Sequence, residues 1–232
     1  TDYLSIKGQY SQMSISGSDI HATSDFVKTR NLSFKTPISE FSFIPEFNFT
    51  FLKDDEFLSS FKPFIFVGVS YYIFNPTTNY QGQIVELQPL GTEGQGITGQ
   101  PEKYKLNQIA IPFGGGLKIN IKNNWQLAIF GNLRYSRTDY LDDTSGNYAP
   151  DFDSLVATNG NLAGELSSRR WEFLNAQCDC DDFTPSNTYQ PGAIRGGPNF
   201  KDWFFTLGVS VSYRLLKITK KGNHRSACPT WK

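Results

Sequence analysis

The chain has 232 residues, enough for a sizeable hydrophobic core, and its 22 Lys and Arg balance its 22 Asp and Glu. This neutral charge gives no sign of nucleic-acid binding, and no apolar run approaches the ~20 residues of a transmembrane helix. Charged residues make up 19%, below the ~25% usual in soluble domains, whereas 20 Phe and 11 Tyr make aromatic residues abundant. The 3 Cys exclude a disulfide scaffold, and the odd number hints at an intermolecular bond.

Strand-like alternation begins near the N-terminus and is clearest from Ser39 to Phe51. From Phe41 onward one parity of that run is aromatic except for Pro45, and the other parity carries Glu40 and Glu46. Because side chains on a strand alternate between faces, the run predicts a strand with one apolar and one polar face. It is also long enough for the roughly nine to eleven residues that cross a bilayer at a tilt.

Four further segments alternate in the same way: Tyr3–Met13, Leu106–Ile121, Trp125–Arg137 and Asp202–Leu216. A sixth segment, Phe61–Phe74, is apolar on both parities, so its orientation stays open. Repeated alternation at this length predicts an all-β protein, a transmembrane antiparallel up-and-down β-barrel. We expect the barrel to span residues 1–216 and a basic tail to occupy residues 217–232.

The connections predict an orientation in the outer membrane. Lys122–Asn124 is a tight turn, and outer-membrane barrels have short periplasmic turns and long outer loops. We therefore expect Leu52–Ser60 and both termini to be periplasmic. The long connections then lie outside, at Asp19–Lys35, Asn75–Tyr104 and Tyr140–Lys201, and a helix is expected near Asn161–Arg170.

Six strands do not close a known barrel, because eight is the usual minimum. We expect a hairpin upstream of Thr1 to complete eight strands. The alternative is a hairpin hidden within Tyr140–Lys201 that uses Trp171–Leu174. In either case side chains should fill the interior. The charges expected there are Glu40, Glu46, Lys118, Arg134 and Arg214, as a mixed-sign network with a structural role.

Enzyme and metal motifs give little support for catalysis. His21 and His224 are the only histidines and fall on opposite sides of the expected membrane, so neither a triad nor a zinc site can be built. The carboxylates of Asp139, Asp142, Asp143 and Asp151 could bind Ca²⁺, but without EF-hand spacing or a turn glycine they are expected to bind loop backbone instead. Gly91–Gly96 lacks the flanking elements and the Lys of a phosphate loop. We expect no catalytic residue, cofactor or metal.

The cysteines fall in two settings. Cys178 and Cys180 lie in an acidic outer loop, and their state is left open because one intervening residue makes a mutual disulfide difficult. Cys228 lies in the basic tail, which suits phospholipid head groups or a docked protein. The residues expected to bind a partner are Lys220, Lys221, Arg225, Cys228, Pro229 and Trp231.

Several blocks resemble the PorG-type outer-membrane barrels of the Bacteroidota type IX secretion system. They are Arg30–Phe34, Leu87–Gly96, Ile111–Gly116, Thr138–Asp143, Arg195–Gly196, Asp202–Trp203 and Cys228–Pro229, in family order. The family's N-terminal hairpin with its Gly-Asp-Leu motif is missing here, and Asp151–Gln190 has no counterpart.

This resemblance implies a non-enzymatic barrel that anchors a periplasmic ring, made of a PorK-like lipoprotein and a PorN-like soluble partner, to the outer membrane. It also implies a disulfide from Cys228 to the ring lipoprotein. The expected partners are these two proteins and outer-membrane lipids, without nucleic acid. The alternatives are a small outer-membrane barrel for solute or lipid handling and, as a third reading, a soluble lipocalin-like binder.

Overall fold

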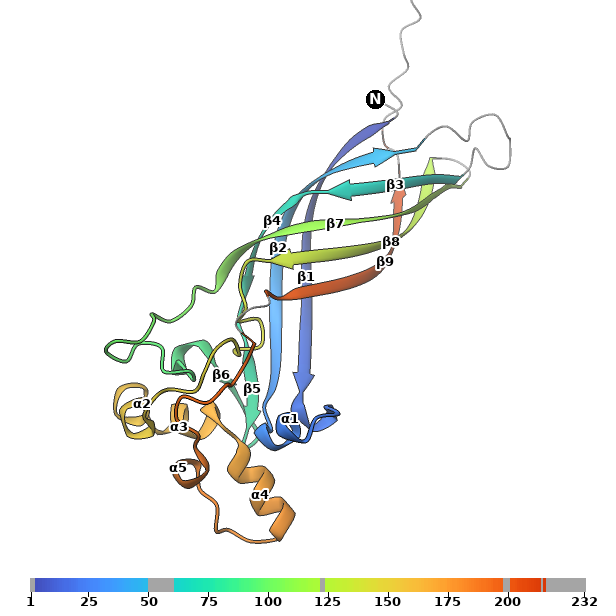
Figure 1. Cartoon of the computed structure of the whole chain (residues 1–232). Coiled ribbons are helices and arrows are strands. Elements are labelled where there is room, and N and C mark those ends of the chain that lie inside the picture. Colours follow the sequence, from blue (N-terminus) through green and yellow to red (C-terminus); the bar gives the residue numbers. More distant parts are fainter. Residues whose placement is uncertain (1–2, 50–60, 122–123, 198–200, 214, 216–232) are drawn as a thin grey trace, which may run out of the picture.

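The computed structural model describes residues 3–49, 61–121, 124–197, 201–213 and 215. The described chain is mostly β, with one antiparallel sheet of nine strands, as the alternation predicts (Figure 1). The strands are β1 Leu4–Ser18, β2 Ser33–Asn48, β3 Phe61–Val67, β4 Val69–Phe74, β5 Thr77–Tyr80, β6 Gln83–Glu86, β7 Asn107–Asn120, β8 Trp125–Ser136 and β9 Trp203–Tyr213.

Helices occupy the long connections. They are the 3-10 turns η1 Asp19–His21 and η3 Gln88–Leu90, and the α-helices α1 Asp25–Arg30, α2 Phe152–Asn159, α3 Asn161–Ser167, α4 Arg170–Cys178 and α5 Pro185–Thr188. The helix expected near residue 161 is therefore present as α3. The hidden hairpin is wrong, because Trp171–Leu174 lies inside α4.

The long strands lie side by side in the sheet in their chain order, whereas the short hairpin β5–β6 extends from one end of β2. β1 pairs with β2, whose other edge pairs in turn with β5, β4 and β3. β7 then pairs with β3 and β4, β8 with β7, and β9 with β8. Among the described residues β1 and β9 are the long edge strands, with no ladder recorded between them.

The expected sixth strand is divided at Gly68 into β3 and β4. The Gly68 N–H donates to Pro112 O, and a Cβ at Gly68 would lie 2.4 Å from the carbonyl oxygen of Phe43. Only glycine tolerates such a close approach of the neighbouring backbone. The orientation left open by the sequence is also resolved, since Phe64 and Tyr72 are buried and Ile65 is exposed.

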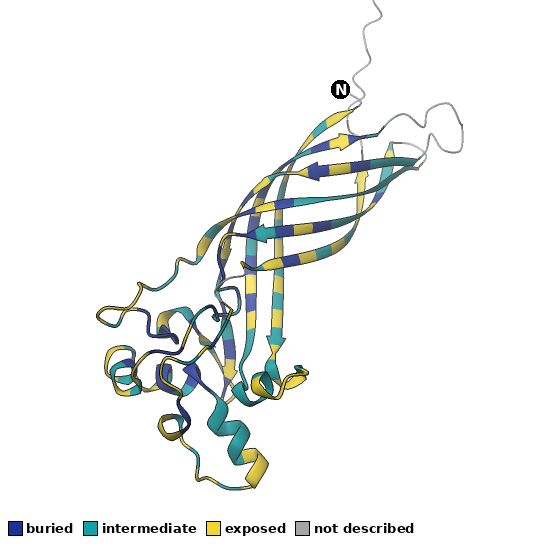
Figure 2. Ribbon diagram, viewed as in Figure 1, coloured by how far each residue is buried: buried dark blue, intermediate teal, exposed yellow. Residues whose placement is uncertain are grey.

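The two faces of the sheet differ sharply, as the alternating bands in Figure 2 show. We call the face that carries Glu40 the inner face and the face that carries Phe41 the outer face. The sheet is strongly curled. Lys7 Nζ of β1 lies 5.3 Å from the ring centroid of Phe130 in β8, although β2, the divided strand β3–β4 and β7 lie between β1 and β8 in the sheet. The inner face therefore packs against itself.

All three long connections leave the same end of the sheet and pack together there (Figure 1). We call the described residues of 19–32, 75–106 and 137–202 the cap. Apolar clusters hold it, one around Tyr148, Leu155 and Tyr189 and one around Tyr80, Leu87 and Leu166. The short turns expected at Leu52–Ser60 and Lys122–Asn124 involve residues 50–60 and 122–123, which lie outside the described residues.

Candidate functional site

The inner face carries a buried ion pair between β2 and β8. Arg134 Nε donates to Glu40 Oε2 at 2.7 Å, and at most 3% of either side chain is exposed. Ser42 Oγ donates to the second oxygen of Glu40, and Arg134 Nη1 donates to Thr206 Oγ1 of β9. Each charge is thus both paired and hydrogen-bonded, as a buried charge requires.

A second ion pair lies nearer the other end of the sheet. Lys118 Nζ of β7 lies 2.5 Å from Glu46 Oε2 of β2 and donates also to Asn48 Oδ1 at 2.8 Å. The Lys118 ammonium group also lies 4.4 Å from the ring centroid of Phe64. Of the five charges expected inside, four thus form two pairs, and Arg214 lies outside the described residues.

The space left beside these pairs is small. A pocket of ≈ 40 Å³ is lined by side chains that include Lys7, Glu46, Lys118 and Asn132. A cavity needs a volume of roughly 10–15 Å³ to hold one water molecule, whereas pockets that bind small molecules usually have volumes of about 300–1,000 Å³. Asn132 Oδ1 is buried beside this space without a hydrogen-bond partner in the described part of the chain, so the pocket suits ordered water better than a solute.

The outer face is apolar along most of its length. Phe41 is 63% exposed, although its neighbour Glu40 is only 1% exposed. The other large exposed side chains on the long strands include Ile6, Tyr10, Phe43, Phe47, Ile65, Val67, Val69, Tyr71, Ile73, Ile109, Ile111, Ile129, Trp203, Phe205, Leu207, Val209 and Val211. This distribution reverses that of a soluble sheet, in which apolar side chains face the core.

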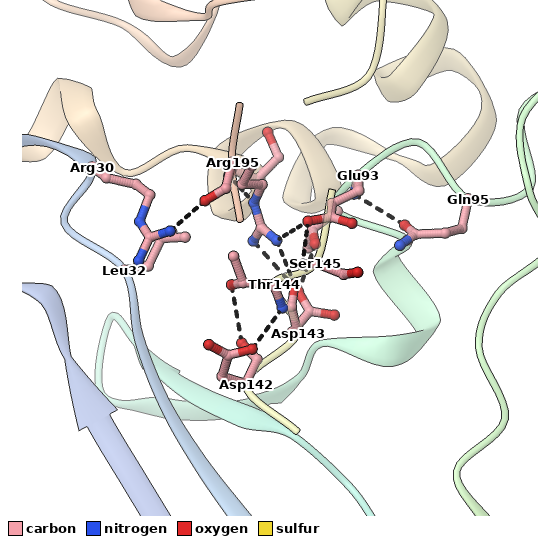
Figure 3. A network of polar contacts seen from close by, with 12 residues as sticks. Arg30, Leu32, Glu93, Gln95, Asp142, Asp143, Thr144, Ser145 and Arg195 are labelled. Carbon is pink, nitrogen blue, oxygen red and sulfur yellow. Dashed lines mark hydrogen bonds and ion pairs between the residues drawn. The ribbon is translucent and has the colours of Figure 1, made fainter. Parts of the chain in front are cut away.

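A different polar network lies in the cap, around a fully buried arginine (Figure 3). Arg195 Nη1 lies 3.3 Å from Glu93 Oε1, and Nη2 lies 3.5 Å from Asp143 Oδ2. Its Nη1 also donates to the backbone oxygen of Asp143, and its Nε donates to Ser167 O at 2.9 Å. One guanidinium group therefore joins the second and third connections.

The glycine-rich loop Gly91–Gly96 brings Glu93 to this arginine. The backbone N–H groups of Ser145 and Gly146 donate to Glu93 Oε1 at 2.8 and 3.1 Å. Gly94 has φ +88°, and a Cβ there would lie 2.8 Å from the Cβ of Ala149. The glycine is thus required both by its left-handed backbone and by close packing.

The first connection reaches the same network through Arg30. Arg30 forms a bidentate pair with Asp19, with Nε and Nη2 at 2.7 and 2.8 Å from the two carboxylate oxygens. Its remaining Nη1 donates to the backbone oxygen of Arg195. All three connections are therefore linked through Arg195. The sequence named this arginine only within the block Arg195–Gly196 and gave it no role, because a lone arginine in a loop carries no periodic signal.

The aspartates expected to bind loop backbone do so only in part: Asp142 and Asp151 accept from backbone N–H groups, whereas Asp139 and Asp143 accept from side chains. Asp143 accepts from Thr92 Oγ1 at 2.5 Å and from the Tyr104 hydroxyl at 2.6 Å. Burial raises the pKa of Asp143, and the Arg195 guanidinium opposes that rise. Asp142 accepts from the Thr144 N–H, and burial together with repulsion from Asp202 raises its pKa to about 7.

Cys178 and Cys180, whose state the sequence leaves open, are bonded to each other at the end of α4. The tail residues Lys220, Lys221, Arg225, Cys228, Pro229 and Trp231 lie outside the described residues. In the described ranges, no group of three or more His, Cys, Asp or Glu side chains is arranged to hold a metal ion. Nor is any helix within those ranges both long and apolar enough to cross a membrane.

Fold and site together define a curled antiparallel sheet with ion pairs on its inner face, an apolar outer face and a helical cap. The chain belongs to the family described as a domain of unknown function (DUF6089), whose model matches residues 3–175. That match runs from the start of β1 into α4 and ends before Arg195. No curated protein and no solved structure matches the chain.

Proposed function

We propose that the chain is a non-enzymatic outer-membrane β-barrel of the type IX secretion system, which anchors the periplasmic ring of a PorK-like lipoprotein and a PorN-like soluble partner. The observation that carries the membrane part of this proposal is the side-chain distribution of the sheet. Glu40, Glu46, Lys118 and Arg134 pair on the inner face, while the outer face exposes rows of aromatic and branched aliphatic side chains.

Lipid is the solvent that suits this outer face. Soluble monomers rarely expose contiguous apolar patches larger than a few hundred Å², whereas the exposed apolar rows here continue across neighbouring long strands. β1, β2, β7 and β8 have 15, 16, 14 and 12 residues, more than the nine to eleven that cross a bilayer. A lipocalin-like binder would need the opposite arrangement, with an apolar interior and a polar exterior.

The topology supports closure into an up-and-down barrel. The long strands are neighbours in the sheet in their chain order, and Lys7 of β1 reaches across the interior to Phe130 of β8. Closure as the eight-stranded barrel expected from the sequence calls for one more hairpin between β1 and β9. The cap would then face the cell exterior, and the end of the sheet at Leu4 and Tyr213 would face the periplasm.

The filled interior favours an anchor over a pore. Side chains occupy the space between β2 and β8, and the pocket beside Lys118 and Glu46 measures only ≈ 40 Å³. Solute passage would require both buried ion pairs to separate, which is costly because each would leave unpaired charges. An anchor needs only a stable body in the membrane and a binding face on the periplasmic side.

The proposal of these two ring partners follows from the resemblance to PorG-type barrels. It can be tested through the tail, residues 217–232, which contains Cys228. We expect the full-length protein, purified in mild detergent from its own cells, to carry a PorK-like lipoprotein, joined by a disulfide through Cys228. Non-reducing gels should show this adduct for the native chain and lose it for Cys228→Ser. The matched control is the double variant C178S/C180S, which should keep the adduct.

Two outcomes would contradict the proposal. An adduct that survives Cys228→Ser would place the covalent link elsewhere. Solute flux through liposomes carrying the purified protein, together with absence of the ring lipoprotein from the detergent pull-down, would support the solute-handling alternative instead.

A further inference from the structure

The disulfide Cys178–Cys180 lies at an exposed end of the cap. Cys178 is the last residue of α4, and the Cα atoms of the two cysteines are 5.3 Å apart. Residues 176–179 are all exposed, and Figure 2 shows this end of α4 projecting away from the sheet. A molecule approaching the cap from outside can therefore reach the bond without any rearrangement.

This bond contributes little to holding the loop, because Asn175 already does so. Asn175 Nδ2 donates to Phe183 O at 2.8 Å, and its Oδ1 accepts from the Phe183 N–H at 2.9 Å. The Cys180 N–H donates to Asn175 O at 3.2 Å. A disulfide stabilises mainly by closing a long loop in the unfolded chain, and a separation of two residues closes almost none.

The neighbouring charges decide which thiol can react. Exposed disulfides that are dispensable for the fold are the ones that exchange with thiols, and the attacking species is a thiolate anion. Asp179, Asp181 and Asp182 lie next to the two cysteines in the sequence, and the segment 137–202 as a whole has 11 Asp and Glu against 5 Lys and Arg. A thiolate in acidic surroundings is repelled, whereas one flanked by Lys or Arg is attracted.

We propose that Cys178–Cys180 is a thiol–disulfide exchange site that captures a cysteine of a partner protein whose thiol lies among basic residues. The partner thiolate attacks the Sγ of Cys178, the more exposed of the two cysteines, and forms a new S–S bond. The old S–S bond breaks, and Cys180 leaves as a thiolate that takes a proton from water. One disulfide is consumed and one is formed, so no oxidant is needed.

The structure also provides for reversal. Cys180 Sγ lies 3.9 Å from Asn175 Oδ1, which can accept the proton of the released thiol and keep it beside Cys178. When that proton is lost, Cys180 can attack Cys178 again and expel the partner. The site is therefore a reversible covalent latch on the cap, distinct from the anchoring through Cys228 and independent of it.

The test uses the full chain with Cys228→Ser, so that Cys178 and Cys180 are the only cysteines left. Two cysteine peptides of the same length, one flanked by Lys and one by Glu, are mixed with the protein, and the mixed disulfide is followed by mass spectrometry. The Lys-flanked peptide should react faster, on the order of tenfold at low salt. Raising the salt to about 1 M should remove most of the difference, because exposed charges are then screened.

Variants separate the roles of the residues. D179N/D181N/D182N should react with both peptides at similar rates, whereas C178S/C180S should form no adduct. Amide exchange of α4 should be the same in C178S/C180S and in the parent chain, because Asn175 holds the loop. Equal rates for the two peptides in the parent chain, or loss of α4 protection in C178S/C180S, would overturn the proposal.

Discussion

Arg134 and Glu40 meet across the curled sheet, although two strands separate them along its surface. Glu40 pairs with Tyr72 of β4, Tyr72 with Gln108 of β7, and the neighbouring Ala110 with Ser136 of β8. Neighbouring strands lie roughly 4.8 Å apart, so the path along the sheet from β2 to β8 is about 14 Å. The 2.7 Å contact between Arg134 Nε and Glu40 Oε2 therefore requires strong curvature.

Removing one member of this pair should be costly. Glu40→Gln leaves the buried Arg134 without a counter-charge, and we expect a loss of about 3–5 kcal/mol in the free energy of unfolding. Urea titration in detergent measures it, with Glu102→Gln on the exposed cap surface as the control. The double variant E40L/R134M should lose less than the sum of the single losses, and strict additivity would show that the pair is not coupled.

The cap should depend on Arg195 in the same way. Arg195→Met leaves Glu93 and Asp143 buried without their cation, so cap amides should lose protection corresponding to about 3–5 kcal/mol. Hydrogen exchange measures the effect on α2, α3 and α4. The control is Lys28→Met, which removes an exposed ion pair and should change stability by at most about 1 kcal/mol. Unchanged exchange in R195M would refute the central role of this arginine.

Protonation of two of its carboxyl groups should make the cap more stable at low pH. Burial raises the pKa of Asp142 to about 7 and that of Asp202 to about 6, against an ordinary value of 3.8. The folded state then holds more protons than the unfolded state between about pH 4 and 7, so this contribution decreases as pH rises and levels off above pH 7. Cap amide exchange at pH 5 and pH 8, corrected for intrinsic rates, measures it.

Asp142→Asn should remove most of that dependence, because the amide does not titrate. Asp153→Asn, which replaces an exposed carboxylate in α2, is the matched control. A cap in the native chain that becomes more protected as the pH rises from 5 to 8 would contradict this prediction.

Two exposed isoleucines should respond differently to charge. Ile129, 52% exposed on the outer face of β8, would meet lipid, so Ile129→Arg should cost about 2–4 kcal/mol on folding into vesicles. Ile84, 79% exposed in the cap, would meet water, and Ile84→Arg should have almost no effect. Similar folding of the two variants in vesicles would count against the membrane location.

The strands were predictable because alternation is a local property of the chain. The parity of Ser39–Phe51 agrees with the structure wherever its residues are described, with Phe41 exposed and Glu46 buried. The bounds were less accurate. β1 continues to Ser18 and β2 begins at Ser33, because these ends pair with each other beyond the apolar part of either strand.

The cap was largely missed, although some of its signals are visible. Gln81 and Gly82 both have positive φ, and this turn joins β5 and β6 within a segment expected to be a loop. Asp151 accepts from the Ser154 N–H at the start of α2, and Thr184 precedes a proline at the start of α5. Each of these three positions is a recognisable helix or turn signal, but none of them shows how the connections pack together.

The contacts of Arg195 could not be predicted, because they join residues 52 and 102 positions away in the chain. Such contacts depend on where the whole cap folds, whereas the sequence offers only an arginine before a glycine. The same contacts govern what happens when the chain is cut. If the chain were cut once between α3 and α5, the contacts of the Arg195 guanidinium group would hold the two fragments together. The cut protein would then migrate like the uncut protein until a denaturant separated the fragments.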